Sequence, residues 1–136
     1  MSLPHDWRIG HLLINCFYRI DPVLKQRFNE LLDKRILDKV LWAMIEDKLF
    51  PEWVGDSMSF DPLYGQLDGL RRSLTVATRD FLIGLNGTSF RYYFIDFEKD
   101  ELAGMANHVG LTDQDVATLS QELNSRLLAA DNKSAF

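Results

Sequence analysis

The residues that could carry out nucleophilic catalysis are few in this sequence. The single cysteine, Cys16, follows His11 by five positions, and His108 lies far along the chain. A catalytic thiol needs a neighbouring base and a setting that favours the thiolate, whereas Cys16 lies in the apolar run INCFY, which is typical of a small buried thiol. The sequence also lacks a nucleophile elbow, a phosphate-binding loop and a dinucleotide-binding fingerprint. We therefore predict no catalytic residues and no enzyme activity.

An acidic cluster near residue 100 is a second candidate for chemistry, because carboxylates can bind a metal ion. It consists of Asp96, Glu98, Asp100 and Glu101, and His108 follows one helical stretch later. The spacing matches neither an EF-hand loop nor a zinc motif. Carboxylates at the start of a helix complement its dipole, which explains the cluster without an ion. We predict no metal site and no cofactor.

Residues 101–123 carry a more specific pattern. Ala106, Gly110 and Val116 are spaced as a small residue, a turn glycine and an apolar anchor between two helices. The pattern resembles that of helix-turn-helix DNA-binding proteins, and this resemblance implies a DNA-binding regulator. The charges argue against nucleic acid, because the second helix would begin with DQD at residues 113–115 and the whole stretch contains no Lys or Arg.

The remaining signal is a surface one, between residues 46 and 61. Five carboxylates in this stretch are accompanied by one cation, Lys48, and they alternate with aromatic and apolar side chains. Aromatic anchors within a field of one charge sign are typical of an interface for a basic protein. In an alternative interpretation, Trp53 and Phe60 fold back over the core beneath a capped loop. The predicted partner-binding residues are Asp47, Glu52, Trp53, Asp56, Met58 and Tyr64.

The composition indicates what such a surface would bind. The chain has 136 residues and a formal net charge of −5, which argues against general affinity for nucleic acid and is compatible with a basic partner. A small acidic protein with an aromatic-acidic loop and no catalytic residues has the general properties of bacterial immunity proteins, which neutralise a toxin or nuclease. We therefore predict a non-catalytic inhibitor that occludes the active groove of a basic target. The alternatives are a helix-turn-helix regulator and a structural subunit of a helical assembly.

The sequence also bears on location. It contains no apolar run of about 18 residues, and it does not begin with a basic segment followed by an apolar one, so we expect neither a membrane span nor a signal peptide. A lone cysteine cannot form an internal disulfide, which agrees with a reducing compartment. We expect a cytoplasmic protein.

The apolar pattern of residues 61–86 predicts a long helix around which the rest of the fold is organised. Asp61 and Pro62 form a cap-and-proline start, and Asn86 with Gly87 forms an αL-type stop. The residues at helical spacing on one face are Leu63, Leu67, Leu70, Leu74, Ala77, Phe81 and Leu85. With that face buried, the helix would be the central post of a small helical domain.

Further helices are predicted on both sides of this one. Asp21 and Pro22 repeat the cap-and-proline start, and the apolar face changes sides near Lys34, which predicts a kink or break there. Residues 89–97 are aromatic enough for a strand, but they also form one helical face. We favour a helix for them unless residues 12–20 form a second strand.

Together these elements predict an all-α fold, a single compact domain of five or six helices over all 136 residues. Thr112 and Asp115 form a capping-box-like start for the last helix. Residues 1–4 and 131–136 are expected to be flexible. An α+β fold is the alternative if residues 89–97 are a strand.

Overall fold

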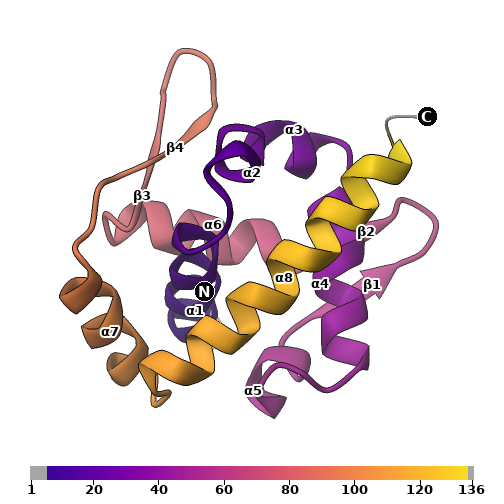
Figure 1. Ribbon diagram of the computed structural model, residues 1–136. Coiled ribbons are helices and arrows are strands. Elements are labelled where there is room, and N and C mark those ends of the chain that lie inside the picture. Colours follow the sequence, from indigo (N-terminus) through magenta and orange to yellow (C-terminus); the bar gives the residue numbers. More distant parts are fainter. Residues whose placement is uncertain (1–5, 135–136) are drawn as a thin grey trace.

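The computed structural model describes residues 6–134, whose elements are labelled in Figure 1. Residues 1–4, predicted to be flexible, lie outside the described residues, as do the last two of the chain; residues 131–134, also predicted to be flexible, continue the last helix. The described residues form eight helices and two antiparallel sheets of two strands each. In chain order the elements are α1 (Asp6–Tyr18), α2 (Pro22–Gln26), α3 (Phe28–Asp33), α4 (Ile36–Glu46), α5 (Glu52–Gly55), β1 (Ser59–Asp61), β2 (Gln66–Asp68), α6 (Leu70–Arg79), β3 (Ile83–Leu85), β4 (Tyr92–Phe94), α7 (Lys99–His108) and α8 (Asp113–Ser134). The predicted all-α class is therefore wrong, and the structure is α+β.

The innermost helix is α1, because its side chains are buried nearly all the way round. Ile9, Leu12, Ile14 and Phe17 are each at most 1% exposed. α6, α7 and α8 pack against α1, and Figure 1 shows it near the middle of the molecule. A helix that is apolar on all sides is stable only when other elements cover it. α1 therefore takes the central place that the sequence pattern assigned to residues 61–86.

Gly10 sets how closely α1 and α6 approach each other. A Cβ atom on Gly10 would lie 2.6 Å from the carbonyl oxygen of Ser73 and 3.6 Å from the amide nitrogen of Ala77. Both are backbone atoms of α6, which cannot rotate away, so a larger residue would push the two helices apart. The glycine weakens α1 as an isolated helix, but it allows α1 and α6 to pack closely.

Residues 61–86 do not form one long helix, so that prediction is wrong. Gly65 and Gly69 adopt left-handed backbone conformations, with φ of +63° and +103°, and these interrupt a right-handed helix. The Asp61 carboxylate does accept a hydrogen bond from the amide of Leu63 (3.0 Å), but it closes a turn instead of capping a helix. β1 and β2 then pair across this turn as an antiparallel hairpin.

α6 keeps only the middle of the predicted apolar face. Leu70, Leu74 and Ala77 are completely buried, whereas Leu63 and Phe81, which lie outside the helix, are 79% and 82% exposed. Phe81 follows α6 in the left-handed conformation, with φ of +61°, at a position that glycine usually occupies after a helix. The leucine periodicity thus identified a buried helix but not where it begins and ends.

β3 and β4 form the second sheet, and β4 lies within residues 89–97, where the sequence favoured a helix. Gly84 of β3 pairs with Tyr93 of β4 in antiparallel register. The partner strand therefore comes from the end of the supposed central helix and not from residues 12–20, which are helical up to Tyr18. The helix favoured for residues 89–97 is wrong because β3 supplies the ladder hydrogen bonds that a lone strand would lack.

Side chains of α1 and α3 hold this second sheet in place. The amide group of Asn29 acts as a neighbouring strand would: its Nδ2 donates to the carbonyl of Tyr92 (2.9 Å), and its Oδ1 accepts from the Tyr92 amide (2.8 Å). The hydroxyl of Tyr18 donates to the carbonyl of Leu82 (2.8 Å) and accepts from the amide of Ile95 (2.7 Å). Both side chains therefore join the sheet to the helical core.

Several helix boundaries do follow the signals in the sequence. Asp21 accepts a backbone hydrogen bond at the start of α2. The break between α3 and α4 falls at Lys34 and Arg35, where Arg35 has φ of +64°. Thr112 and Asp115 cap the start of α8 reciprocally, each side chain accepting a hydrogen bond from the backbone amide of the other. These signals act within a few residues of chain, which is why they survive in the folded protein.

One buried ion pair joins α4, β2 and α6. The Asp38 carboxylate is completely buried and accepts hydrogen bonds from the amide of Leu67 (2.8 Å) and from Nη1 of Arg71 (2.9 Å). A buried carboxylate is stable only when its charge and lone pairs are matched in this way. These contacts fix the position of the β1–β2 hairpin on α4.

The pH dependence of stability should report on the contacts of α3. Glu30 lies between Arg27 and Lys34, whose side-chain nitrogens are 2.9 and 2.8 Å from its carboxylate oxygens. These hydrogen bonds lower the pKa of Glu30 from 4.5 to about 2. The ionised group therefore stabilises the fold above pH 4.5, and this contribution is lost as the pH falls to about 2. We expect Glu30→Gln to reduce the loss of unfolding free energy across that window in urea titrations.

A second variant shows whether the two cations are the cause. In a Lys34→Met background, Glu30 keeps only the Arg27 contact, so Glu30→Gln should change the pH dependence less than it does in the wild type. An identical pH dependence for wild type and Glu30→Gln between pH 4.5 and 2 would contradict the assignment.

Candidate functional site

The apolar residues of the predicted binding surface fold back onto the protein. Trp53 is half-buried against the core, and the guanidinium carbon of Arg8 lies 4.1 Å from the centre of its ring. Met58 is only 6% exposed, and Phe60 stacks on Trp42 with ring centres 5.9 Å apart. This is the geometry of the alternative interpretation, in which the aromatic side chains cover the core. Met58, predicted as a partner-binding residue, is therefore part of the core.

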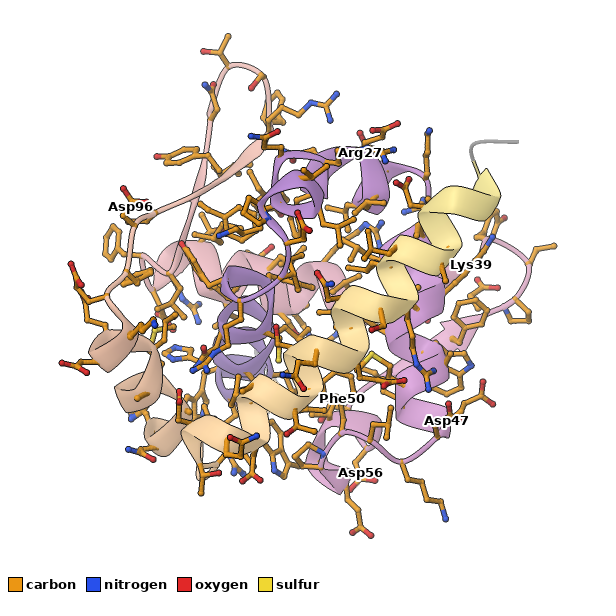
Figure 2. The ribbon with its side chains drawn as sticks, in the orientation of Figure 1. Arg27, Lys39, Asp47, Phe50, Asp56 and Asp96 are labelled. Carbon is orange, nitrogen blue, oxygen red and sulfur yellow. The ribbon has the colours of Figure 1, made fainter. Side chains whose placement is uncertain are left out.

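Three carboxylates of the same stretch, Asp47, Glu52 and Asp56, are exposed and lie at one end of the molecule. Asp47 follows α4, and Glu52 and Asp56 lie at the two ends of α5. In Figure 2, Asp47 and Asp56 project outward from this end, and Asp96 lies on the opposite side. The acidic cluster after β4 therefore does not extend the surface.

Tyr64 is exposed, but it lies away from these carboxylates. It belongs to the turn between β1 and β2 and precedes Gly65, whose Cβ position would lie 3.3 Å from Cε of Lys39. Lys39 is in the first half of α4, whereas Asp47 follows the last residue of that helix, and Figure 2 shows the two well apart. The structure thus places Tyr64 near a lysine and not at the acidic end.

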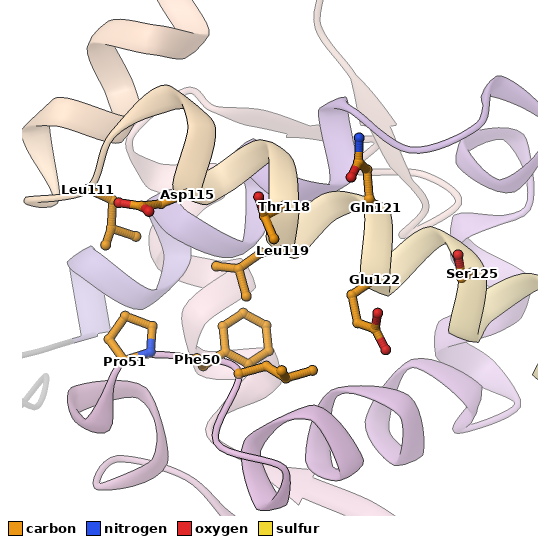
Figure 3. A pocket seen from close by; sticks show the side chains of 10 residues that line it. Phe50, Pro51, Leu111, Asp115, Thr118, Leu119, Gln121, Glu122 and Ser125 are labelled. Carbon is orange, nitrogen blue, oxygen red and sulfur yellow. The ribbon is translucent and has the colours of Figure 1, made fainter.

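A groove of about 730 Å³ opens between α8 and the segment that joins α4 to α5 (Figure 3). Phe50 and Leu119 form a buried floor, and α8 contributes polar side chains along one wall. The lining residues are Leu49, Phe50, Pro51, Leu111, Asp115, Thr118, Leu119, Gln121, Glu122 and Ser125. An apolar floor beside a few polar groups is typical of a binding site.

Carboxylates outnumber cations around this groove. Arg126 is shared between Glu122 and Asp47, with a nitrogen–oxygen distance of 2.7 Å to each, and these contacts raise the pKa of Arg126. Arg126 therefore neutralises only part of the charge of these two carboxylates, and it joins the end of α4 to α8. Asp115 adds a further carboxylate to the lining. We call the groove lining together with Asp47, Glu52 and Asp56 the acidic groove.

Sequence reasoning missed the contribution of α8 to this surface. Its outermost residues at helical spacing, Gln114, Thr118, Gln121 and Ser125, are all exposed and all uncharged. Surface helices ordinarily carry charged residues on the face that points away from the core. The absence of charge along this face was visible in the sequence and is the signal that could have identified α8.

The helix-turn-helix pattern describes part of the structure. Ala106 and Val116 are completely buried, and Gly110 turns the chain between α7 and α8 with φ of +85°. Asp113 and Asp115 are exposed in the first turn of α8, which is the part that would enter a DNA groove. Ala106, Gly110 and Val116 therefore have the structural roles that the pattern predicts. The carboxylates of Asp113 and Asp115 oppose contact with phosphates.

The candidate nucleophile Cys16 is inaccessible. Its side chain is completely buried, and burial raises the pKa of the thiol to about 12. His11 does not activate it, because its Nε2 lies 3.0 Å from the Asp80 carboxylate and its ring lies 5.6 Å from that of His108. Within residues 6–134, no group of three or more His, Cys, Asp or Glu side chains is placed to hold a metal ion.

Burial of Cys16 predicts its reactivity. We expect a disulfide reagent such as dithionitrobenzoate to leave the native protein unmodified at pH 8 and to modify it fully in concentrated urea, because thiol exchange requires an accessible thiolate. A Ser125→Cys variant, whose new thiol lines the groove, should react at once and serves as the control. Equally fast labelling of native and unfolded wild type would show that the core opens around α1.

Three comparisons with known proteins, against family models, curated sequences and solved structures, gave no match to this chain. The site is therefore interpreted from its own geometry.

Proposed function

We propose that the protein is a non-catalytic binding protein that docks a basic protein on the acidic groove. The observation that supports this most is the groove itself, in which a buried floor of Phe50 and Leu119 lies beside carboxylates that outnumber the cations. Apolar area removed from water would supply most of the affinity, and the carboxylates would accelerate and orient the encounter.

The mechanism that we propose is occlusion of a basic toxin or nuclease. Such targets bind phosphate groups with cationic residues, and Asp47, Glu52 and Asp56 are exposed carboxylates that can take the place of phosphates. Trp53, half-buried between the core and Arg8, would form a firm edge of the contact area. Inhibition would then require no chemistry, only a stable complex that covers the target's substrate groove.

We also propose that this binding takes place in the cytoplasm. Within residues 6–134, no helix has both the length and the apolar character required to cross a bilayer. The one cysteine is buried as a free thiol, which fits a reducing compartment.

The proposal is tested by reversing the charge of carboxylates at the acidic end of the molecule and, as a control, elsewhere on its surface. Tagged wild-type protein is used to capture basic proteins from a lysate of its source, beside a Glu52→Lys/Asp56→Lys variant and an Asp96→Lys/Asp100→Lys control. Both variants change the net charge equally, but Asp96 of the control lies on the opposite side (Figure 2), and Asp100 follows it in the first turn of α7. We expect the first variant to weaken a purified complex at least about tenfold and the control to leave it unchanged.

Two outcomes would count against the proposal. Equal weakening by both variants would mean that net charge and not this surface attracts the captured protein. Full affinity in the Glu52→Lys/Asp56→Lys variant would remove this end of the molecule from the interface.

A helix-turn-helix regulator is the second candidate function, favoured by the buried Ala106 and Val116 on either side of the Gly110 turn. Its test is binding to double-stranded DNA. Affinity that falls steeply with salt and depends on Gln114, exposed in the first turn of α8, would favour it over the acidic-groove proposal.

A further inference from the structure

The outward face of α8 has an unusual composition. The helix runs across the front of the molecule in Figure 1. Its exposed charged residues Asp113 and Asp115 lie in the first turn, whereas the exposed residues between 116 and 130 are uncharged: Thr118, Gln121, Ser125, Leu128 and Ala129. Asp115 and Glu122 line the groove at one flank, and Glu122 pairs there with Arg126. Interface cores are distinguished from ordinary surface by their depletion of charge, so this face has the composition of a contact area.

A hollow lies on each side of this face. The acidic groove follows one flank, and a second groove of about 540 Å³ follows the other. Gln121 and Ser125 line both of them, so the outward residues of α8 form a ridge between two grooves. Helices pack by inserting ridges of side chains into such grooves.

The two grooves differ in charge. The acidic groove contains the carboxylates Asp47, Glu52, Asp56, Asp115 and Glu122, and the neighbouring Arg126 pairs with two of them. The lining of the second groove has one cation and one carboxylate, Arg19 and Asp21, and therefore no net charge; Arg19 itself is paired with Asp113. A complementary partner would therefore be cationic on the side that faces the acidic groove and neutral on the other.

We propose that the ridge of α8 is the centre of the docking surface and that its occupant is an amphipathic helix of the partner, with Lys or Arg along one flank. The apolar side of that helix covers Leu49 and Leu119, its cationic flank meets Asp115 and Glu122, and its small or neutral residues lie over Gln121. This inference rests on the proposed function and specifies which element of the basic partner is bound.

Charge also argues against an antiparallel second copy of this chain as the occupant. Two α8 helices packed face to face in antiparallel orientation about a two-fold axis would place the acidic groove of one copy against that of the other. Asp115 and Glu122 would then oppose the same carboxylates, and like charges in contact oppose association. A cationic helix meets no such repulsion.

The probe for this proposal is a synthetic helical peptide of leucine, alanine and lysine, about 18 residues or roughly 27 Å long, with lysines along one flank. An analogue with glutamate in place of lysine tests charge, and a proline-interrupted peptide of the same charge tests helicity. Peptide affinity is measured by fluorescence anisotropy, and the site is mapped by amide chemical shifts of the labelled protein.

Gln121→Trp is the decisive variant, because it blocks the ridge without adding charge. Gln26→Trp, an exposed helical glutamine on α2, is the matched control. We expect the lysine helix to bind with amide shifts centred on residues 114–128, and Gln121→Trp to weaken it at least about tenfold while Gln26→Trp does not. The glutamate and proline-interrupted peptides should bind at least about tenfold more weakly.

The outcomes separate this inference from the function on which it rests. Binding that depends on Glu52 and Asp56 but not on Gln121 would keep the acidic-groove proposal and overturn the ridge as its centre. Equal affinity for the proline-interrupted peptide would overturn the helical occupant. Equal affinity for the glutamate peptide would overturn both proposals. A wild-type dimer that Gln121→Trp dissociates would identify a second copy as the occupant instead.

Discussion

Gly10→Ala is expected to destabilise the protein by about 2 kcal/mol, although alanine is the better helix former. The new methyl group would lie 2.6 Å from the carbonyl oxygen of Ser73. That oxygen belongs to the backbone of α6, so the contact is relieved only if α1 and α6 separate along the core. Urea unfolding followed by circular dichroism would measure the change as a lower midpoint with an unchanged slope.

Gly104→Ala is the matched control, because it makes the same substitution in an exposed helix. A Cβ on Gly104 of α7 would have no atom within 4 Å other than those of its chain neighbours and of the nearby backbone of its own helix. Alanine there should stabilise the protein by about 0.5–1 kcal/mol, since it lowers the entropy lost on folding. Opposite signs for the two variants would establish that close helix contact, and not helix propensity, decides the result at Gly10. A stabilising Gly10→Ala would show that α1 and α6 are further apart than described.

Arg71→Met is expected to cost about 3–5 kcal/mol, the largest effect of the substitutions considered. It leaves the Asp38 carboxylate completely buried with the Leu67 amide as its remaining donor. An unpaired buried charge loses its hydration without recovering an equivalent interaction. Chemical unfolding at neutral pH measures the loss directly.

Two further variants isolate the effect of burial. Arg91→Met removes an ion pair of the same length, 2.9 Å, but its partner Asp33 is exposed, so it should cost no more than about 1 kcal/mol. The double substitution Asp38→Leu/Arg71→Met removes both charges and should be less destabilising than Arg71→Met alone. Similar losses for Arg71→Met and Arg91→Met would mean that the Asp38 site is hydrated.

Local signals in the sequence predicted the boundaries that depend on a few neighbouring residues. The cap at Asp21, the break at Lys34 and the reciprocal cap of Thr112 and Asp115 all appear in the structure. In each case, the side chain and the backbone group that it satisfies are close in the chain. Such signals therefore predict structure without knowledge of the tertiary fold.

The prediction of the fold class failed because one long helix and a hairpin followed by a shorter helix share the same apolar pattern. Leucines at positions 67, 70 and 74 are buried in the structure as a helical face would require, but Leu67 belongs to a strand and only the others to α6. The deciding residues were Gly65 and Gly69, whose left-handed conformations end the hairpin turn and begin α6. Gly65 lies beside Lys39 of α4 and Gly69 beside Ser57 and Met58, and periodicity contains none of these tertiary contacts.

The candidate site was predicted in part. The exposed carboxylates Asp47, Glu52 and Asp56 lie at one end of the molecule. They are close together in the sequence, so their proximity in space could be expected. The groove could not be predicted, because its other wall is α8, whose residues Thr118 and Glu122 come from far along the sequence. Only the folded chain brings the two segments together.

The two hydrogen bonds between Asn29 and β4 affect the tendency of the protein to aggregate at high concentration. A two-stranded sheet normally leaves unpaired backbone groups along its edges, and these can recruit a strand from another molecule and start aggregation. Because the Asn29 amide already occupies both the N–H and the carbonyl of Tyr92, a foreign strand cannot pair with the edge at this residue. The Asn29 side chain thus makes two hydrogen bonds that a neighbouring strand would otherwise make, and this disfavours pairing of β4 with a strand of another molecule.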